Sequence, residues 1–337
     1  MADGDGSLPS MTEVACDESG FTGGNLTSLD GVFAHATVSI TRRAAADAIA
    51  ELRRNTHAPA GELKANWLLR TECRADVRRL LGPGGPLAGS AQVHLTDIRY
   101  FLLARILDVL LGRDQVAGTD LPGRTHRTRS MATLLRLEGP TTYGEPTWQS
   151  FLIHAGNLVR MNRRRLPRTA VHDFEEVLTS LVEMHRHGPV RDALVALRGR
   201  SAVVSGVRQR YLDDPKRTPL LEPLIPALSR AVLHWGARSR HLHVLHDEQS
   251  ALTPERIVDI EARLGDVHPG HSLTLSRVDS LAEPRVQIAD LVAGIGRRAA
   301  RGVLLGRSDP ELIELVTPLV DVQSVWPGTE LVEQVGR

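Results

Sequence analysis

Cysteine is nearly absent from this chain of 337 residues, which contains only Cys16 and Cys73, far apart in the sequence. The two form no C-x-x-C pair, so the sequence predicts neither a disulfide framework nor a structural zinc site. Long apolar runs are missing as well. The stretch "FLLARILDVLLG" carries Arg105 and Asp108 and is too short to cross a bilayer. We therefore expect a protein without a membrane partner.

Net charge is also small. The 41 basic and 40 acidic residues leave a formal charge of +1 with neutral histidines, so the balance by itself does not indicate a nucleic-acid partner. The opening "MADGDGSLPSM" lacks the basic start and the apolar run of a signal peptide, and residues 1–10 have the composition of a disordered tail. With so little cysteine, these features predict a soluble cytoplasmic protein. They leave the oligomeric state open.

Several motifs that mark familiar enzyme classes do not occur. There is no Walker loop and no G-x-G-x-x-G after a predicted strand, so the usual signatures of nucleotide cofactors are missing. A G-x-S-x-G nucleophile elbow is absent, and neither cysteine is a plausible nucleophile. The carboxylates are therefore the side chains whose positions suggest chemistry.

Short strand patterns occur near both ends of the chain. Apolar and β-branched residues predict four strands, which are "TEVACDES", "GVFAHATVSIT", "HLHVLHDE" and "HSLTLSRVDS". Helical spacing predicts a helix in "TRRAAADAIAELRRNT" capped by Thr41, another in "TPERIVDIEARLG" capped by Thr253, and a long one in "RVQIADLVAGIGRRAARGVLLG". The stretch "QVHLTDIRYFLLARILDVLLG" begins as a strand and continues as a helix.

The pattern changes between these two ends. From residue 120 to 235, Pro and Gly separate amphipathic helical runs, and almost no strand pattern occurs. Neither end of the chain has enough strands to bury a sheet alone, so we expect both to share one sheet. The sequence thus predicts an α/β domain of residues 11–119 and 236–337, interrupted by a large helical insertion of residues 120–235.

Carboxylates occur where the predicted strands end. Asp17 and Glu18 close the first strand, Asp247 closes "HLHVLHDE", and Asp290 lies in the first turns of the last long helix. Each has an ordinary interpretation as a turn former or a first-turn helix residue. Acids at strand ends can also converge in an α/β fold, where they repel one another unless a divalent cation joins them. Oxygen ligands of this kind suit Mg²⁺ or Mn²⁺.

Four pieces of the sequence resemble the family catalogued as domain of unknown function 3800. They are "DESG" after the opening strand, "ELK" downstream, an aspartate closing a later strand, and "VDS" followed by "VQIADLVAG". The resemblance covers about residues 12–70 and 240–305. It implies a ribonuclease H-like fold, in which flanking helices cover a mixed sheet with acidic residues at its centre. Carried over to this sequence, the family pattern points to Asp17, Glu62, Asp247 and Asp290.

These residues suggest a metal-dependent hydrolase of nucleic-acid phosphodiesters. In this hypothesis Asp17, Asp247 and Asp290 bind Mg²⁺ or Mn²⁺. Glu62 is the fourth catalytic carboxylate, and Lys64 contacts a substrate phosphate. Two metal ions about 3.5–4 Å apart are the usual device for cleaving a phosphodiester by in-line displacement.

Three further groups of residues have more than one interpretation. Asp97, in "HLTD", competes with Glu62 or Asp247, because the strand after the first helix supplies an acid in the ribonuclease H topology. The H-x-H pair in "HLHVLHD" can bind zinc, but no second ligand cluster completes a site, which favours ordinary polar strand positions. Arginines in the insertion either bind the phosphates of a nucleic acid or form a solvated face; the predicted contacts are Arg163, Arg164 and Arg165.

Two other functions fit the same sequence. A non-catalytic module could retain the ribonuclease H-like fold and bind nucleic acid or a protein through the helical insertion, with the acids as remnants. A metal-dependent phosphohydrolase of small molecules would instead have a closed pocket without a basic approach. The separation of the three aspartates in the folded chain tests the nuclease hypothesis.

Overall fold

In the part of the chain that the structure describes, five runs of apolar and β-branched residues form strands, and all five belong to one mixed sheet. The computed structural model describes residues 9–20, 31–57, 63–111, 121–123, 125–160, 169–214 and 217–327. The strands are β1 (Met11–Ser19), β2 (Val32–Val38), β3 (Ala91–Asp97), β4 (His241–Asp247) and β5 (Ser272–Val278). Their order across the sheet is β3-β2-β1-β4-β5, which makes β1 the central strand.

The two ends of the chain meet at the centre of this sheet. β1 runs parallel to β4, with Met11 opposite His241 and Cys16 opposite His246. β4 is parallel to β5, whereas β2 is antiparallel to both of its neighbours. The prediction that the ends of the chain share one sheet in an α/β fold is therefore confirmed. Because β1, β3, β4 and β5 point the same way, their carboxyl ends lie along one edge of the sheet.

Helices account for most of the remaining described residues. α1 begins as predicted, because the Thr41 hydroxyl accepts a hydrogen bond from the backbone N–H of Ala44 at 3.1 Å. The helices are α1 (Arg42–Thr56), α2 (Ala65–Leu68), α3 (Arg74–Leu81), α4 (Ile98–Leu110), α5 (His126–Tyr143), α6 (Glu145–Val159), α7 (Ala170–Met184), α8 (Pro189–Val195), α9 (Ala202–Asp213), α10 (Leu224–Gly236), α11 (Pro254–Val267), α12 (Pro284–Leu304) and α13 (Pro310–Val316). Within the described residues, no helix is both long and apolar enough to cross a membrane.

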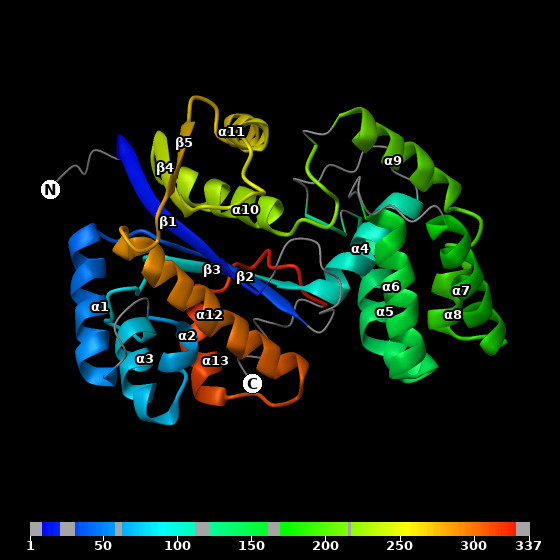
Figure 1. Cartoon of the computed structure of the whole chain (residues 1–337), viewed down its shortest axis with the longest axis horizontal. Coiled ribbons are helices and arrows are strands. Elements are labelled where there is room, and N and C mark those ends of the chain that lie inside the picture. The colour runs from blue at the N-terminus through cyan, green and yellow to red at the C-terminus, as the bar shows by residue number, and fades with distance from the viewer. Residues whose placement is uncertain are drawn as a thin grey trace, which may run out of the picture.

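Helices cover both faces of the sheet (Figure 1). On one face, α1, α3, α12 and α13 pack around a core that includes Ala15 of β1 and Leu245 of β4. On the other face, α10 packs on the strands and α11 packs on α10 and β5, around a core that includes Cys16 and Val244. Since side chains alternate along a strand, odd-numbered residues of β1 face α12 and even-numbered residues face α10.

α4 leaves the sheet directly at the end of β3 and forms the middle of a helical region (Figure 1). Every residue of α4 is buried, including Arg105 and Asp108, because α5, α6 and α9 pack around it. α7 and α8 complete this region by packing on α6 and α5. α10 falls within the predicted insertion but packs on the sheet. The helical region therefore extends from α4 to α9, rather than from residue 120 to 235.

The chain after α13 runs along the outer edge of β3. The backbone N–H groups of Asp321 and Val325 donate to the carbonyl oxygens of Val93 and Leu95, each at 2.8 Å. The N–H of Asp97 donates in turn to the carbonyl oxygen of Val325 at 2.9 Å. These bonds satisfy backbone groups that an edge strand would otherwise expose to other chains.

Candidate active site

The carboxyl end of β1 carries two consecutive acids that are both largely buried. Asp17 is 7% exposed, and the side chain of Glu18 is 12% exposed. Alternation along the strand directs Asp17 toward α12 and Glu18 toward α10. The backbone N–H of Glu18 donates to Oδ1 of Asp17 at 2.7 Å. The central strand therefore brings one carboxyl group to each face of the sheet at the same edge.

Two other predicted acids lie beside Asp17. Cys16 of β1 is opposite His246 of β4. The next residues on these parallel strands, Asp17 and Asp247, are therefore neighbours, with backbones about 5 Å apart, the usual distance between paired strands. By the same alternation Asp247 faces α12. Asp290 comes from α12, which packs on β1. Both Asp247 and Asp290 lie near enough to Asp17 for their charges to raise its pKa, so the three aspartates of the predicted metal set gather at this edge of the sheet.

Burial and repulsion change the acidity of the two β1 acids. Burial, together with the negative charges of Glu18, Asp290 and Asp247, raises the pKa of Asp17 to about 8. Burial also raises the pKa of Glu18 to about 7, with contributions from Asp247, Glu222 and Asp290. Both groups are therefore partly or mostly protonated near neutral pH. If all of these acids were ionised, the edge of the sheet would hold more negative charge than its surroundings compensate.

Lys64 reaches this edge from the segment just before α2. Its Nζ lies 3.3 Å from Oδ2 of Asp290, and 58% of the lysine side chain is exposed. The contact of Lys64 with a substrate phosphate stays a prediction. Four other predicted residues lie outside the described residues: Glu62, Arg163, Arg164 and Arg165.

Asp97 has a structural role and is not available to complete the site. It caps α4, because its Oδ1 accepts hydrogen bonds from the backbone N–H groups of Arg99 and Tyr100 at 2.9 and 3.2 Å. Its Oδ2 accepts from Nε of Arg136, on α5, at 2.6 Å. The side chain is 1% exposed and both of its oxygens are engaged. Asp97 therefore holds α4 and α5 to the end of β3.

Two buried histidines, His35 and His246, lie beside Glu18 on the face of the sheet that α10 covers. They were not predicted from the sequence. Nε2 of His35 lies 3.3 Å from Nε2 of His246. Nδ1 of His246 lies 3.0 Å from the carbonyl oxygen of Asp247, which can only accept, so this nitrogen carries the hydrogen. His246 Nε2 then accepts from His35. Burial lowers the pKa of His246 to about 4, so the pair adds no positive charge beside Glu18 near neutral pH.

No signal in the sequence pairs these two histidines. His35 and His246 each occupy one position in a predicted strand, and no spacing rule links residues that far apart. The register of the sheet brings them together, since Glu18 is opposite His35 and Cys16 is opposite His246. Oε2 of Glu18 lies 3.9 Å from His246 Nε2.

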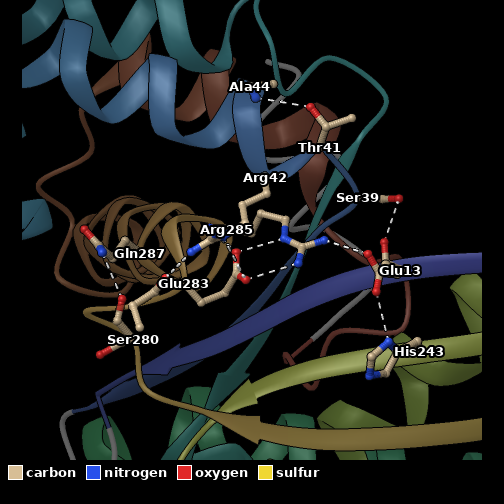
Figure 2. A network of polar contacts seen from close by, with 11 residues as sticks. Glu13, Ser39, Thr41, Arg42, Ala44, His243, Ser280, Glu283, Arg285 and Gln287 are labelled. Carbon is tan, nitrogen blue, oxygen red and sulfur yellow. Dashed lines mark hydrogen bonds and ion pairs between the residues drawn. The ribbon is translucent and has the colours of Figure 1, made fainter.

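A polar network fixes the start of α12, as Figure 2 shows. Nε and one Nη of Arg285 donate to the two carboxylate oxygens of Glu283 at 2.9 and 3.1 Å. The other Nη donates to Oε2 of Glu13, on β1, at 2.9 Å. His243 of β4 contacts the second oxygen of Glu13 at 3.0 Å. The network joins the first turn of α12 to the two central strands and thereby positions Asp290.

The remaining polar residues of interest also make structural contacts. Nε2 of Gln287 donates to the carbonyl oxygens of Ser280 and Leu281 at 2.9 and 3.3 Å, which holds the loop before α12 (Figure 2). His241 contacts the hydroxyl of Ser272 at 2.8 Å. The H-x-H pair of β4 therefore makes contacts that join neighbouring strands.

The donors at the sheet edge match a hard divalent cation in chemistry. Oε2 of Glu18 is buried without a hydrogen-bond partner in the described part of the chain. Carboxylate oxygens are the ligands that Mg²⁺ and Mn²⁺ prefer. Among the described residues, no group of three or more His, Cys, Asp or Glu side chains is arranged to hold a metal ion. Carboxylates repel one another without a cation between them, so binding one would require these side chains to move together.

Comparisons with protein-family models, curated proteins and solved structures give no match to this chain. They therefore transfer neither a family nor an activity to the site. The function proposed below is therefore argued from the positions and the chemistry of the site residues.

Proposed function

We propose that this chain is a metal-dependent hydrolase of nucleic-acid phosphodiesters. The observation that carries the proposal is the position of Asp17, buried at the end of the central strand beside Asp247 and Asp290. Burial raises its pKa to about 8, which means that the ionised form is unfavourable in this place. A divalent cation bound by the three aspartates would supply the positive charge that makes the ionised form stable.

The sheet supports the fold that belongs to this proposal. The sheet is mixed, with β2 antiparallel to the other strands, and flanking helices cover it, as the resemblance to ribonuclease H-like domains implies. The acids lie on the central strands β1 and β4, as the resemblance to the domain of unknown function 3800 family implies. We therefore include the ribonuclease H-like fold and membership of that family in the proposal.

The residues have distinct roles in the proposed reaction. Asp17, Asp247 and Asp290 would hold Mg²⁺ or Mn²⁺, which when bound lowers the pKa of a water molecule and neutralises charge at the phosphorus. Glu18, whose pKa is raised to about 7 by burial and by nearby acids, can hold or release a proton at Oε2 near neutral pH. Lys64 is largely exposed beside Asp290 and can contact a phosphate oxygen.

The test is hydrolysis of DNA and RNA by the purified protein with Mg²⁺ or Mn²⁺. We expect cleavage that EDTA abolishes. Asp17→Asn and Asp290→Asn should each reduce the rate by about 100-fold or more, because each removes a charged group that acts on the transition state. Asp266→Asn, an exposed aspartate on α11, is the matched control and should leave the rate unchanged.

Two results would contradict the proposal. One is an absence of cleavage of either nucleic acid with either ion. The other is cleavage that persists in Asp17→Asn at the rate of the Asp266→Asn control, since a contaminating nuclease would behave in this way.

A further inference from the structure

One side of α12 carries basic residues beyond Asp290. Arg297 follows Asp290 by about two helical turns, and Arg301 follows Arg297 by about one turn. Residues at these spacings lie on the same side of a helix. α12 runs along β1 and β2 (Figure 1). The candidate carboxylate site and a short basic stripe therefore adjoin each other on one helix.

Arg297 extends from α12 across the end of β1. Its Nε donates to the carbonyl oxygen of Val32, at the start of β2, at 3.0 Å. Gly20, the residue after β1, has a φ of +102°, and a Cβ there would lie 2.3 Å from Nε of Arg297. The absence of a side chain at Gly20 therefore leaves the space that the arginine occupies. The Arg297 side chain therefore lies against Gly20, which follows Asp17 by three residues.

In the described part of the chain, no acid balances the charge of Arg297. Within the described residues, Arg297 forms no ion pair, and its one hydrogen bond goes to a backbone carbonyl. Burial lowers its pKa, and the neighbouring Arg301 lowers it further. Two other arginines on this side of the sheet do have acidic partners: Arg74 pairs with Asp309, and Arg285 pairs with Glu283. A half-buried guanidinium that a backbone carbonyl holds in position can bind an anion through its remaining N–H groups.

We propose that Arg297, assisted by Arg301, forms a subsite that binds a phosphate of a nucleic-acid strand beside the candidate carboxylate site. The planar guanidinium can donate two parallel hydrogen bonds to one phosphate through the nitrogens that do not contact Val32. Arg301, which is exposed, adds a second positive charge one turn further along the helix. The choice of a nucleic acid as the ligand rests on the proposed function; the anion subsite itself rests on Arg297.

Binding of a fluorescently labelled single-stranded oligonucleotide in EDTA, followed by anisotropy, tests this subsite without hydrolysis. We expect Arg297→Gln to weaken binding by about fivefold to tenfold and to reduce the slope of log affinity against log salt by about 0.7–1, because one phosphate contact is lost. Arg298→Gln is the matched control. Arg298 is exposed and points about 100° away around the helix, so its loss should change binding by less than about twofold.

Two additional variants separate binding from folding. Arg301→Gln changes an exposed side chain and should weaken binding by about twofold to threefold. Arg297→Lys retains the charge but not the paired donors, so it should bind between wild type and Arg297→Gln. The subsite is refuted if Arg297→Gln, Arg297→Lys and Arg301→Gln all bind like the Arg298→Gln control, or if the wild type does not bind the oligonucleotide. Wild-type binding with the expected Arg297 effect but no metal-dependent cleavage would instead reject the proposed hydrolase and retain the subsite.

Discussion

Asp17 and Glu18 hold protons more tightly in the folded protein than in the unfolded chain. Their ordinary pKa values are about 4, whereas burial raises the folded-state pKa of Asp17 to about 8 and that of Glu18 to about 7. Between these limits the folded state binds more protons than the unfolded state. The contribution of these two groups to the free energy of unfolding is therefore highest at about pH 4 and falls as the pH rises to about 8.

Asp17→Asn should remove much of this pH dependence. In EDTA at pH 8 we expect the variant to be more stable than the wild type by about 1–3 kcal/mol, because the neutral amide avoids the buried charge and keeps an acceptor for the N–H of Glu18. Near pH 4 the two proteins should be equally stable. Urea denaturation across this pH range measures the difference. A variant that is less stable than wild type at pH 8 would show that Asp17 has a structural role instead.

The same variant should also lose a response to metal. Mg²⁺ or Mn²⁺ should raise the melting temperature of the wild type, because a ligand that binds the folded state stabilises it by mass action. In Asp17→Asn this increase should be largely absent, as followed by thermal denaturation with and without the ion. An equal increase in both proteins would place the ion elsewhere.

At the scale of elements, the junction between β3 and α4 depends on Asp97. One side chain caps the helix and binds Arg136 of α5, so it couples the last residue of a strand to two helices. Such a residue cannot also move toward a metal without releasing these contacts. The sequence indicated Asp97 only as an acid that competes with Glu62 or Asp247 for the site, because Arg136 is distant from it along the chain.

Replacement of Asp97 separates this structural role from a catalytic one. Asp97→Ala should lower the free energy of unfolding by about 3–5 kcal/mol, because it removes the cap and leaves Arg136 without its buried partner. Asp97→Asn keeps a capping acceptor and should cost less. Both variants should retain the metal-induced increase in melting temperature measured for the wild type. If a folded Asp97→Asn protein lost that increase, Asp97 would belong to the metal set.

At the scale of the whole molecule, the helical region and the sheet share one hydrophobic core. A single cluster of buried side chains runs from Val14 of β1 through α10 and α4 to Phe151 of α6 and Phe174 of α7. α4 is buried on all sides within it. The helical region is therefore not an independent unit attached by exposed connections.

We expect the protein to unfold in one cooperative transition. Phe151→Ala, which truncates a fully buried ring, should destabilise the protein by about 3–5 kcal/mol. The loss in free energy of unfolding should be the same when it is measured from the helical circular dichroism signal in the far ultraviolet and from the hydrogen exchange of β1 and β4 amides, because the core is continuous. If the strands kept wild-type protection while the helices melted, the two regions would be separate domains.

The local elements and their buried faces could be predicted from the order of the amino acids. The apolar residues of "TEVACDES" predicted β1, and the alternation of side chains along a strand separates Asp17 from Glu18 on opposite faces. Thr41 and the Ala-rich run after it determined where α1 begins, because a cap and helical spacing act over only a few residues. The sharing of one sheet by the two ends of the chain followed from how few strands each end has.

The side chains that become partners could not be predicted in this way, because the packing of distant elements brings them together. Asp97 binds Arg136, Lys64 approaches Asp290, and His35 meets His246, although no spacing in the sequence relates the members of these pairs. The limits of the helical region also depended on packing, since α4 is surrounded by helices and α10 covers strands. Hydrophobic periodicity shows that a helix has a buried face but not which element covers it, and the pKa of a carboxyl group depends on that covering and on the charges it brings.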